Sequence, residues 1–339
     1  MDEQIPVLST LRFSDTQLER LRAVSSRLLI RQQSIHDDRD DITPFLHGDE
    51  QIIYAMVPPR DLEKLPHLKW VQLHSAGINH LRDHPIWATN IAVTTASGIH
   101  AVPIGEFVIA LMLALARKLP RLTRLEERAE WPRHKWELLL GSELHGQVIG
   151  IVGYGSIGRE VGRIAHDGFK MRVLALKASQ GPSRARYVEP GVGDPEGKIP
   201  ERWFTPAERT SLMSESDFVV LSLPLTAESE HSIGEEQLRA MKPSAFLINI
   251  ARGELIDERA LVRALKESWI AGAGLDVFAT EPLPRESQLW HIENAIVSPH
   301  VSAATAHYDD RAVGLFAENL RRYLGGLPLL NLVDRARGY

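Results

Sequence analysis

The sequence predicts two α/β domains, each built on a parallel β-sheet that is covered by helices. Short apolar runs recur along the chain and alternate with segments of helical periodicity. One of these runs leads directly into a glycine-rich turn. The length of 339 residues suits two domains rather than one. Strands that alternate with helices pair in parallel, so each half is expected to form a doubly wound sheet.

The first hundred residues contain strand candidates but no glycine-rich fingerprint. Ser14 and Asp15 can cap a helix whose apolar stripe is Leu18, Leu21 and Val24. A short helix is expected to begin at Pro59. The expected strands cover residues 5–8, 27–31, 51–57, 69–74 and 91–95.

A long helix is expected over residues 103–118. Its segment 107–116 is apolar all round, so it should be buried, between domains or between subunits. The same run is about half as long as a bilayer-spanning helix. A charged helix is expected over 121–128, followed by an irregular stretch that carries Trp131 and Trp136. Tryptophans on such an arm are more often anchors between subunits than a ligand cage.

The chain is organised around residues 147–161. An apolar strand at 148–152 runs into the pattern G-x-G-x-x-G, formed by Gly153, Gly155 and Gly158, which opens a helix. The first glycine permits a tight turn, the second lets a pyrophosphate approach the backbone, and the third lets helix and strand pack closely. N–H groups at the helix start can hold phosphates. Many glycine turns bind no ligand, but this strand–turn–helix context favours a dinucleotide site.

Further strands are expected in the second half at 171–176, 217–223, 245–250, 271–278 and 295–298. A helix is expected over 257–268, and the Gly- and Pro-rich segment 181–203 should be a loop. A last helix over 305–324, with Val313, Phe316 and Leu320 on its inner face, should pack back on the first domain. The expected domains are therefore 1–100 plus 304–339, and 101–303.

Composition excludes several classes of function. A net charge of -5 predicts no general attraction to nucleic acid or to anionic membranes. The chain has no cysteine, which excludes disulfides and thiol catalysis. Its 14 histidines show no zinc-ligand spacing with a third partner, so no metal site is predicted. The acidic N-terminus shows no secretory signal and no regulatory domain is expected after the polar tail, so a cytoplasmic location is expected.

Residues at strand ends are the candidates for chemistry, because ligands of open α/β sheets bind at the carboxyl ends of strands. Arg252 follows the expected strand at 245–250, Asp276 and Glu281 lie at and after the strand at 271–278, and His300 follows the strand at 295–298. Each also has a plainer interpretation, as a surface charge, a turn cap or a loop histidine. Their joint placement favours one constellation.

The second half resembles the D-isomer-specific 2-hydroxyacid dehydrogenases, the family of D-lactate, D-glycerate, glyoxylate/hydroxypyruvate and D-3-phosphoglycerate dehydrogenases. The matching segments follow the family's order and cover 147–303 almost continuously, whereas residues 1–100 match mainly at 73–78. The segments are 146–158, 221–226, 249–253, 274–282 and 298–300. The resemblance implies a flavodoxin-like substrate domain, a Rossmann NAD(P)-binding domain, a cleft between them and dimerisation through an arm near 103–145.

The resemblance also implies roles for individual residues. His300 would be the general acid/base, Glu281 would favour its protonated form, and Arg252 would bind the substrate carboxylate. Backbone N–H groups near Ser75, Ala76 and Gly77 would hold the other side of that carboxylate. Asp276 would hold the nicotinamide carboxamide. The expected cofactor-binding residues are Gly153, Gly155, Ser156, Ile157, Gly158, Lys177, Leu223, Pro224, Thr226, Ala251, Asp276 and Ala303.

One departure from the family pattern bears on the cofactor. NAD-dependent members carry an acidic residue at the end of the second strand, where this chain has Lys177, with Ser179, Arg184 and Arg186 nearby. Basic residues would attract a 2′-phosphate, which favours NADP, with NAD possible if the basic loop is merely solvated.

The substrate is expected to be a 2-oxo acid of the glyoxylate or hydroxypyruvate type, because a high NADPH ratio drives reduction. Formate dehydrogenases are disfavoured because their pattern has Gln where this chain has Glu281. The long phosphoglycerate dehydrogenases are disfavoured because no C-terminal extension is seen. The alternative is a nucleotide-sensing corepressor-like protein, which would use the same scaffold with little turnover.

Overall fold

The computed structural model describes residues 3–34, 42–177 and 186–335, and the chain divides into two compact units. Unit 1 comprises Met1–Ile99, Pro182–Glu189 and Thr305–Tyr339, and unit 2 comprises His100–Gly181 and Pro190–Ala304. The side chain of Asn331 fixes part of the middle segment to unit 1. Its Oδ1 accepts from the Tyr187 N–H at 3.0 Å, and its Nδ2 donates to the carbonyls of Thr95 and Ser97.

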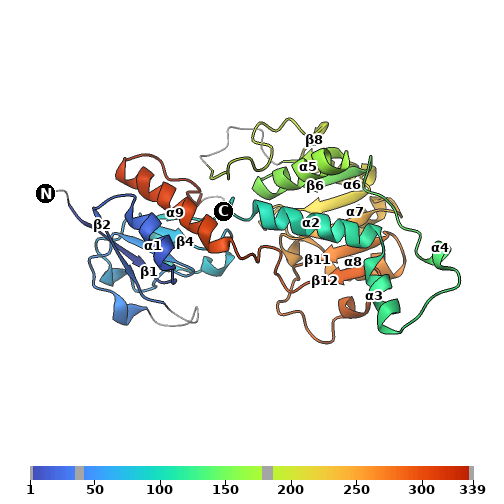
Figure 1. Cartoon of the computed structure of the whole chain (residues 1–339), viewed down its shortest axis with the longest axis horizontal. Helices are drawn as coiled ribbons and strands as arrows, with labels where there is room; N and C mark the ends of the chain where they lie inside the picture. The colour runs from blue at the N-terminus through green and yellow to red at the C-terminus, as the bar shows by residue number, and fades with distance from the viewer. Residues whose placement is uncertain (1–2, 35–41, 178–185, 336–339) are drawn as a thin grey trace. The chain divides into compact units, whose positions relative to one another are not determined.

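Unit 1 is built on a five-stranded parallel sheet in the order β2-β1-β3-β4-β5. This is the flavodoxin-like order, as expected. Figure 1 shows helices α1 and α9 beside its blue strands. The strands are β1 (Ile5–Ser9), β2 (Leu28–Gln32), β3 (Ile52–Ala55), β4 (Trp70–Leu73) and β5 (Ala92–Thr94).

Local chemistry explains where α1 (Asp15–Arg22) begins. Ser14 accepts from the Gln17 N–H while the Gln17 side chain accepts from the Ser14 N–H, which is a capping box. Leu18 and Leu21 are buried as predicted. Val24 lies after the end of the helix and packs partly buried against the same core.

Helix α9 (Tyr308–Leu324) covers one face of the sheet of unit 1, as the sequence predicts. Val313, Phe316 and Leu320 are fully buried in the core that also contains Tyr54 and Trp70. The Phe316 ring lies 4.8 Å from that of Tyr54. The last helix therefore completes the first unit rather than the second.

Unit 2 is built on a seven-stranded parallel sheet in the order β12-β11-β10-β9-β6-β7-β8. Counted from β6, this is the Rossmann order with one further strand at the β12 edge. The strands are β6 (Val148–Val152), β7 (Arg172–Leu176), β8 (Arg202–Phe204), β9 (Phe218–Leu221), β10 (Phe246–Asn249), β11 (Gly272–Leu275) and β12 (Ala295–Val297). The helices of this unit are α2 (Ala101–Ala116), α3 (Leu119–Glu127), α4 (Lys135–Leu138), α5 (Ser156–Phe169), α6 (Arg209–Glu215), α7 (Glu235–Ala240) and α8 (Glu258–Lys266).

Short 3-10 helices lie in the connections of both units. They are η1 (Thr43–Phe45), η2 (Leu62–Lys64), η3 (Asn79–Leu81), η4 (Pro85–Ala88), η5 (Pro206–Glu208), η6 (Gly253–Leu255) and η7 (Gln288–His291).

Helix α2 is buried inside unit 2, where it packs on α5 and on strands β10 to β12 (Figure 1). Val108, Met112 and Leu115 belong to the core between this helix and the sheet. Gly105 allows close packing on α5, because a Cβ there would lie 3.0 Å from the Glu160 side chain. None of the described helices is both long and apolar enough to cross a membrane.

The segment 181–203 differs from the predicted loop in its last part. Residues Arg202–Phe204 form β8, which pairs with β7 at the edge of the sheet. Upstream, the buried Asp194 carboxylate accepts from the Tyr154 hydroxyl at 3.0 Å and from the N–H groups of Lys198 and Ile199. The Asp194 carbonyl accepts from Arg159. These bonds fix residues 194–199 to α5 and to the glycine turn.

One row of paired residues marks the carboxyl edge of the sheet of unit 2. Because the strands are in register, six positions of six neighbouring strands lie side by side. From β12 to β7 they are Val297, Leu275, Asn249, Leu221, Val152 and Leu176. Residues that follow this row are therefore placed along one edge.

Candidate active site

The predicted residues of unit 2 all follow that row by a few positions. Parallel strands end at a common edge of the sheet, so the residues that follow them share that edge. One predicted residue for each strand, in the order of the strands, is His300 after β12, Asp276 after β11, Arg252 after β10, Leu223 after β9, Gly153 after β6 and Lys177 after β7.

The glycine turn has the shape that a dinucleotide requires. Gly153 has φ 102°, and a Cβ there would lie 2.7 Å from the backbone nitrogen of Leu223. A Cβ at Gly158 would lie 2.4 Å from the Gly153 carbonyl oxygen. A Cβ at Gly155 would meet none of the described atoms within 4 Å. Gly153 and Gly158 are thus needed for packing, and Gly155 leaves the open side of the turn to a ligand.

The start of α5 is also suited to binding a dinucleotide. Its N-cap residue is Gly155, so no N-cap side chain accepts from the first N–H groups of the helix. Ser156 and Ile157 are the first helical residues. Their N–H groups, together with the helix dipole, suit a pyrophosphate. The residues present therefore fit a nicotinamide dinucleotide.

The remaining predicted cofactor residues of unit 2 lie around the same edge. Ser229 Oγ donates to the Pro224 carbonyl at 2.8 Å and accepts from the Thr226 N–H at 2.7 Å, which shapes the turn after β9. Ala251 is buried and Ala303 is half-buried against the core. The Lys177 N–H donates to the Phe204 carbonyl, which fixes its backbone beside β8.

The other residues that were predicted to lie near the 2′-phosphate do not share the position of Lys177. Ser179 and Arg184 lie outside the described residues. Arg186 is exposed and belongs to the segment Pro182–Glu189, which is part of unit 1. Of the two described members of this group, Lys177 lies on the edge that carries the glycine turn.

Arg252 is held by the turn that follows β10. The buried Asn249 donates from Nδ2 to the Arg252 carbonyl at 2.8 Å and accepts on Oδ1 from the Ala251 N–H at 3.1 Å. Gly253 contacts the neighbouring loop directly, since a Cβ there would lie 1.9 Å from the carbonyl carbon of Phe278. The Arg252 turn is thereby tied to the loop that carries Glu281.

His300 and Glu281 form a pair. The His300 Nδ1 lies 2.8 Å from the Glu281 Oε2, and the Glu281 Oε1 accepts from the Phe278 N–H at 3.0 Å. The side chains remain 48% and 36% exposed, so solutes can reach them. An imidazole oriented by a carboxylate, and accessible, is the usual form of a general acid/base.

Asp276 shapes the loop that carries His300. Its carboxylate is fully buried and accepts from the Ser298 hydroxyl at 2.7 Å and from the N–H groups of Val301 and Ser302, each at 2.9 Å. Its carbonyl accepts from the His300 N–H at 2.9 Å. His300 has φ 54°, which an L-residue rarely adopts. These bonds on both sides of His300 stabilise that backbone. The role toward the nicotinamide that the resemblance implies for Asp276 stays a prediction.

Unit 1 carries the predicted loop Ser75, Ala76 and Gly77, which His74 separates from the end of β4. The Ser75 hydroxyl donates to the Gly77 carbonyl at 2.9 Å, and the Ser75 carbonyl accepts from the Ala96 N–H at 2.9 Å. These bonds close a tight loop between β4 and the segment after β5.

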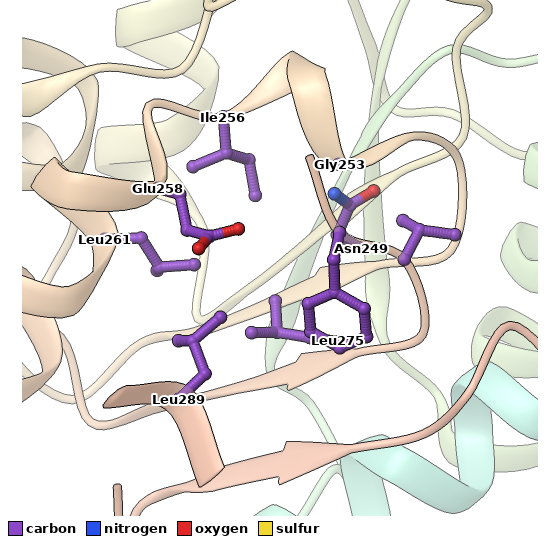
Figure 2. Close-up of a pocket in the computed structure, with 9 residues that line it drawn as sticks. Asn249, Gly253, Ile256, Glu258, Leu261, Leu275 and Leu289 are labelled. Atoms are coloured by element: carbon purple, nitrogen blue, oxygen red, sulfur yellow. The ribbon is translucent and has the colours of Figure 1, made fainter. Parts of the chain in front are cut away.

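A small cavity of about 10 Å³ lies beside the Arg252 turn but does not suit an organic substrate. Figure 2 shows Glu258 and Leu261 of α8 lining it together with Leu289 and Asn249. This volume is about the space that one water molecule needs, roughly 10–15 Å³, so the cavity cannot hold an oxo acid. Most of its lining is apolar.

Sequence reasoning missed the supporting residues Asn249 and Ser298. Asn249 carried a local signal, because an Asn that precedes a turn by two or three residues often bonds its backbone. Ser298 carried none, because its partner Asp276 is distant in the sequence.

The fold and the site define a class of protein: a two-unit α/β protein with a dinucleotide-type glycine turn, in which Arg252, Glu281 and His300 follow three neighbouring strands of the same sheet. The family model for the NAD binding domain of the D-isomer specific 2-hydroxyacid dehydrogenases matches residues 109–302. The glyoxylate reductase of Korarchaeum cryptofilum (strain OPF8) is 37% identical over 291 residues, which are 84% of this chain and 83% of that protein.

Solved structures of the same family are also similar to this chain. A D-isomer specific 2-hydroxyacid dehydrogenase family protein from Aeromonas salmonicida subsp. salmonicida A449 is 28% identical with a TM-score of 0.78, covering 98% of this chain and 100% of that one. The D-isomer specific 2-hydroxyacid dehydrogenase from Xanthobacter autotrophicus Py2, in complex with NADPH and MES, is 28% identical with a TM-score of 0.75, covering 99% and 100%.

The chain therefore belongs to the D-isomer specific 2-hydroxyacid dehydrogenase family. It is an oxidoreductase of that class and uses a nicotinamide dinucleotide.

Proposed function

We propose that this enzyme reduces a small 2-oxo acid to the D-2-hydroxy acid, with His300 as acid, Glu281 as its partner and Arg252 as the carboxylate ligand. The observation that carries the proposal is the 2.8 Å contact between His300 and Glu281, one strand away from the Arg252 turn. Backbone N–H groups of Ser75, Ala76 and Gly77 are a second set of donors for the carboxylate.

The chemistry assigns each residue a task. The bound nicotinamide supplies the hydride for reduction or accepts it in the reverse direction. His300 gives a proton to the carbonyl oxygen during reduction and removes it during oxidation, and Nε2 is the nitrogen that performs this because Nδ1 faces Glu281. Arg252 can bind a carboxylate through two parallel N–H donors, which also fixes the orientation of the carbonyl.

Glyoxylate and hydroxypyruvate are the substrates we propose. The glyoxylate reductase of Korarchaeum cryptofilum, at 37% identity over most of both chains, supports glyoxylate. A small oxo acid also requires only the carboxylate and carbonyl contacts that the named residues can provide.

NADPH is the cofactor we propose. Lys177 follows β7, where an acidic residue would bind the ribose hydroxyls of NAD. A lysine there favours the extra phosphate of NADPH through charge. The relative from Xanthobacter autotrophicus crystallised with NADPH supports this choice.

The test is a steady-state assay of the purified protein with glyoxylate, hydroxypyruvate, pyruvate, phenylpyruvate and phosphohydroxypyruvate, each with NADPH and NADH. We expect the highest kcat/KM for glyoxylate or hydroxypyruvate with NADPH. A strong preference for NADH would reject the cofactor proposal. Tight NADPH binding combined with feeble reduction of every oxo acid would favour the nucleotide-sensing alternative.

We also propose that the enzyme is a homodimer that associates through residues 103–145. Trp131 and Trp136 expose 83% and 82% of their surface, and the Lys135 Nζ lies 5.1 Å and 5.7 Å from their ring centroids. Leu119, Leu122 and Leu140 are exposed on the same arm. Exposed aromatic and apolar residues that cluster in this way indicate an interface. Sedimentation showing only monomer would contradict the proposal.

A further inference from the structure

A cluster of aromatic residues in unit 1 lies directly before the loop Ser75–Gly77. It consists of Tyr54 on β3, His74 directly after β4 and Tyr308 at the start of α9, with the carboxylate of Asp309 beside them. The His74 ring packs against both tyrosines, with ring centroids 5.7 Å from Tyr54 and 4.7 Å from Tyr308. Three separate elements of the unit thus meet at one histidine.

Apart from Nε2, each hydrogen-bonding group of His74 has a partner in this cluster or in the sheet. Its N–H donates to the Ala55 carbonyl at 2.9 Å. Its carbonyl accepts from the Tyr308 hydroxyl at 2.8 Å. Its Nδ1 lies 2.7 Å from the Tyr54 hydroxyl. The residue that precedes the loop is therefore fixed through both its backbone and its side chain.

The protonation states define the direction of the side-chain bond. Burial raises the pKa of Tyr54 well above its usual value, so Tyr54 keeps its O–H at neutral pH. Burial lowers the pKa of His74, with Asp309 opposing this effect, so the imidazole is neutral. Asp309 lies 3.8 Å from Nε2 and favours the tautomer with the proton there. Tyr54 then donates to Nδ1.

We propose that His74, fixed by Tyr54 and Tyr308, is a positioning residue for the oxo-acid carboxylate, acting through the backbone of Ser75–Gly77. This inference rests on the proposed function of that loop. A loop whose N–H groups must point at a carboxylate binds more tightly when the residue that precedes it cannot rotate. Tyr308 extends the effect to α9, because its hydroxyl bonds the carbonyl that leads into the loop.

The test uses full-length variants of the enzyme with glyoxylate and NADPH. His74→Leu removes the acceptor of the Tyr54 hydroxyl, Tyr308→Phe removes the donor to the His74 carbonyl, and His74→Asn keeps an acceptor near the position of Nδ1. We expect the KM for glyoxylate to rise about fivefold in the first two variants, the effect of one neutral hydrogen bond. The kcat and the KM for NADPH should stay within about twofold, because ground-state and transition-state binding are lost together.

Two controls separate positioning from general damage. Tyr323→Phe alters another tyrosine of α9, whose ring stacks on Trp70, and should leave the KM for glyoxylate unchanged. His74→Asn should restore most of the affinity that His74→Leu loses. If His74→Leu does not fold, Tyr308→Phe and Tyr54→Phe measure the same bonds singly.

Hydrogen exchange of the peptide that contains residues 74–77 gives a readout that does not need turnover. We expect faster exchange there in His74→Leu and Tyr308→Phe than in the wild type or Tyr323→Phe. An active wild type whose variants show unchanged KM overturns the inference alone. Altered exchange in a protein without oxo-acid reductase activity overturns the proposed function instead, and unaltered exchange overturns the inference in either case.

Discussion

The imidazole of His300 and the carboxylate of Glu281 are joined by a 2.8 Å contact, although the two residues follow different strands of the sheet. The contact orients the ring, and the Asp276 carbonyl fixes the backbone N–H of the same histidine. Side chain and backbone of His300 are thus held independently, while its exposed fraction of 48% leaves it accessible. This combination is what an acid/base residue needs.

Replacement of His300 by Ala should lower kcat by roughly 10²–10⁴-fold, the usual contribution of general acid–base catalysis. The KM for NADPH should change little, because three strands lie between β12, which precedes His300, and β6, which precedes the glycine turn. His291→Ala, an exposed histidine of η7 in the same unit, is the matched control. A near-normal rate for His300→Ala would remove this residue from the mechanism.

Replacement of Glu281 by Gln should lower kcat for glyoxylate by about tenfold, because a neutral amide holds the His300 ring less firmly than a carboxylate does. In the wild type the Glu281 Oε2 lies 2.8 Å from the His300 Nδ1. The KM for NADPH should change little. A kcat equal to that of the wild type would show that the contact does not orient the imidazole for catalysis.

The strands of both sheets could be predicted because their residues form short apolar runs, and their ends differ from the prediction by only a few positions. The edge strand β8 escaped prediction because only Phe204 of its three residues is buried, so it carries no apolar run. Its pairing depends on β7, which is distant in the sequence.

In the candidate site, too, features set by local sequence could be predicted, and features set by distant residues could not. The strand-end rule located Arg252, Asp276 and His300, because position alone was required. What Asp276 does could not be predicted, since its partners Ser298, Val301 and Ser302 lie more than twenty residues away in sequence. His74 escaped for a similar reason, because its importance comes from Tyr54 and Tyr308.

Replacement of Lys177 by Asp should reverse the cofactor preference. A carboxylate at the end of β7 repels a 2′-phosphate and can accept from the ribose hydroxyls of NAD. We expect the ratio of kcat/KM for NADPH to that for NADH to fall by about tenfold or more, a change of roughly 1.4 kcal/mol. Lys170→Asp, which alters an exposed lysine in the turn before β7, is the control. An unchanged ratio would show that Lys177 does not contact the phosphate.

Acidification from pH 7.5 to 5.5 should lower the thermal midpoint of the wild type more than that of His74→Asn. Burial lowers the pKa of His74 below the usual 6.5, so the unfolded chain takes up a proton in this range before the folded chain does. Stability is therefore lost as pH falls below about 6.5, by at most about 1.4 kcal/mol per pH unit for one group, and the loss ends below the folded pKa. His84, whose pKa burial also lowers, contributes in the same direction in both proteins. Equal pH dependence of the two proteins would contradict the assignment.

Replacement of Asp276 by Asn should reduce both stability and turnover, although the two side chains have the same shape. The carboxylate oxygens accept from the Ser298 hydroxyl and from two backbone N–H groups, and an amide must turn its own N–H groups toward one of these donors. The unmatched buried donor should cost about 1–3 kcal/mol in the free energy of unfolding, measured with urea. Because the same loop holds His300 at φ 54°, kcat should fall while cofactor affinity, measured by NADPH fluorescence, shows whether Asp276 also contacts the nicotinamide. Ser298→Ala, which removes only one of the donors, should give a smaller loss of both stability and kcat. If Asp276→Asn kept full stability and lost only NADPH affinity, its main role would be in binding the cofactor and not in shaping the loop of His300.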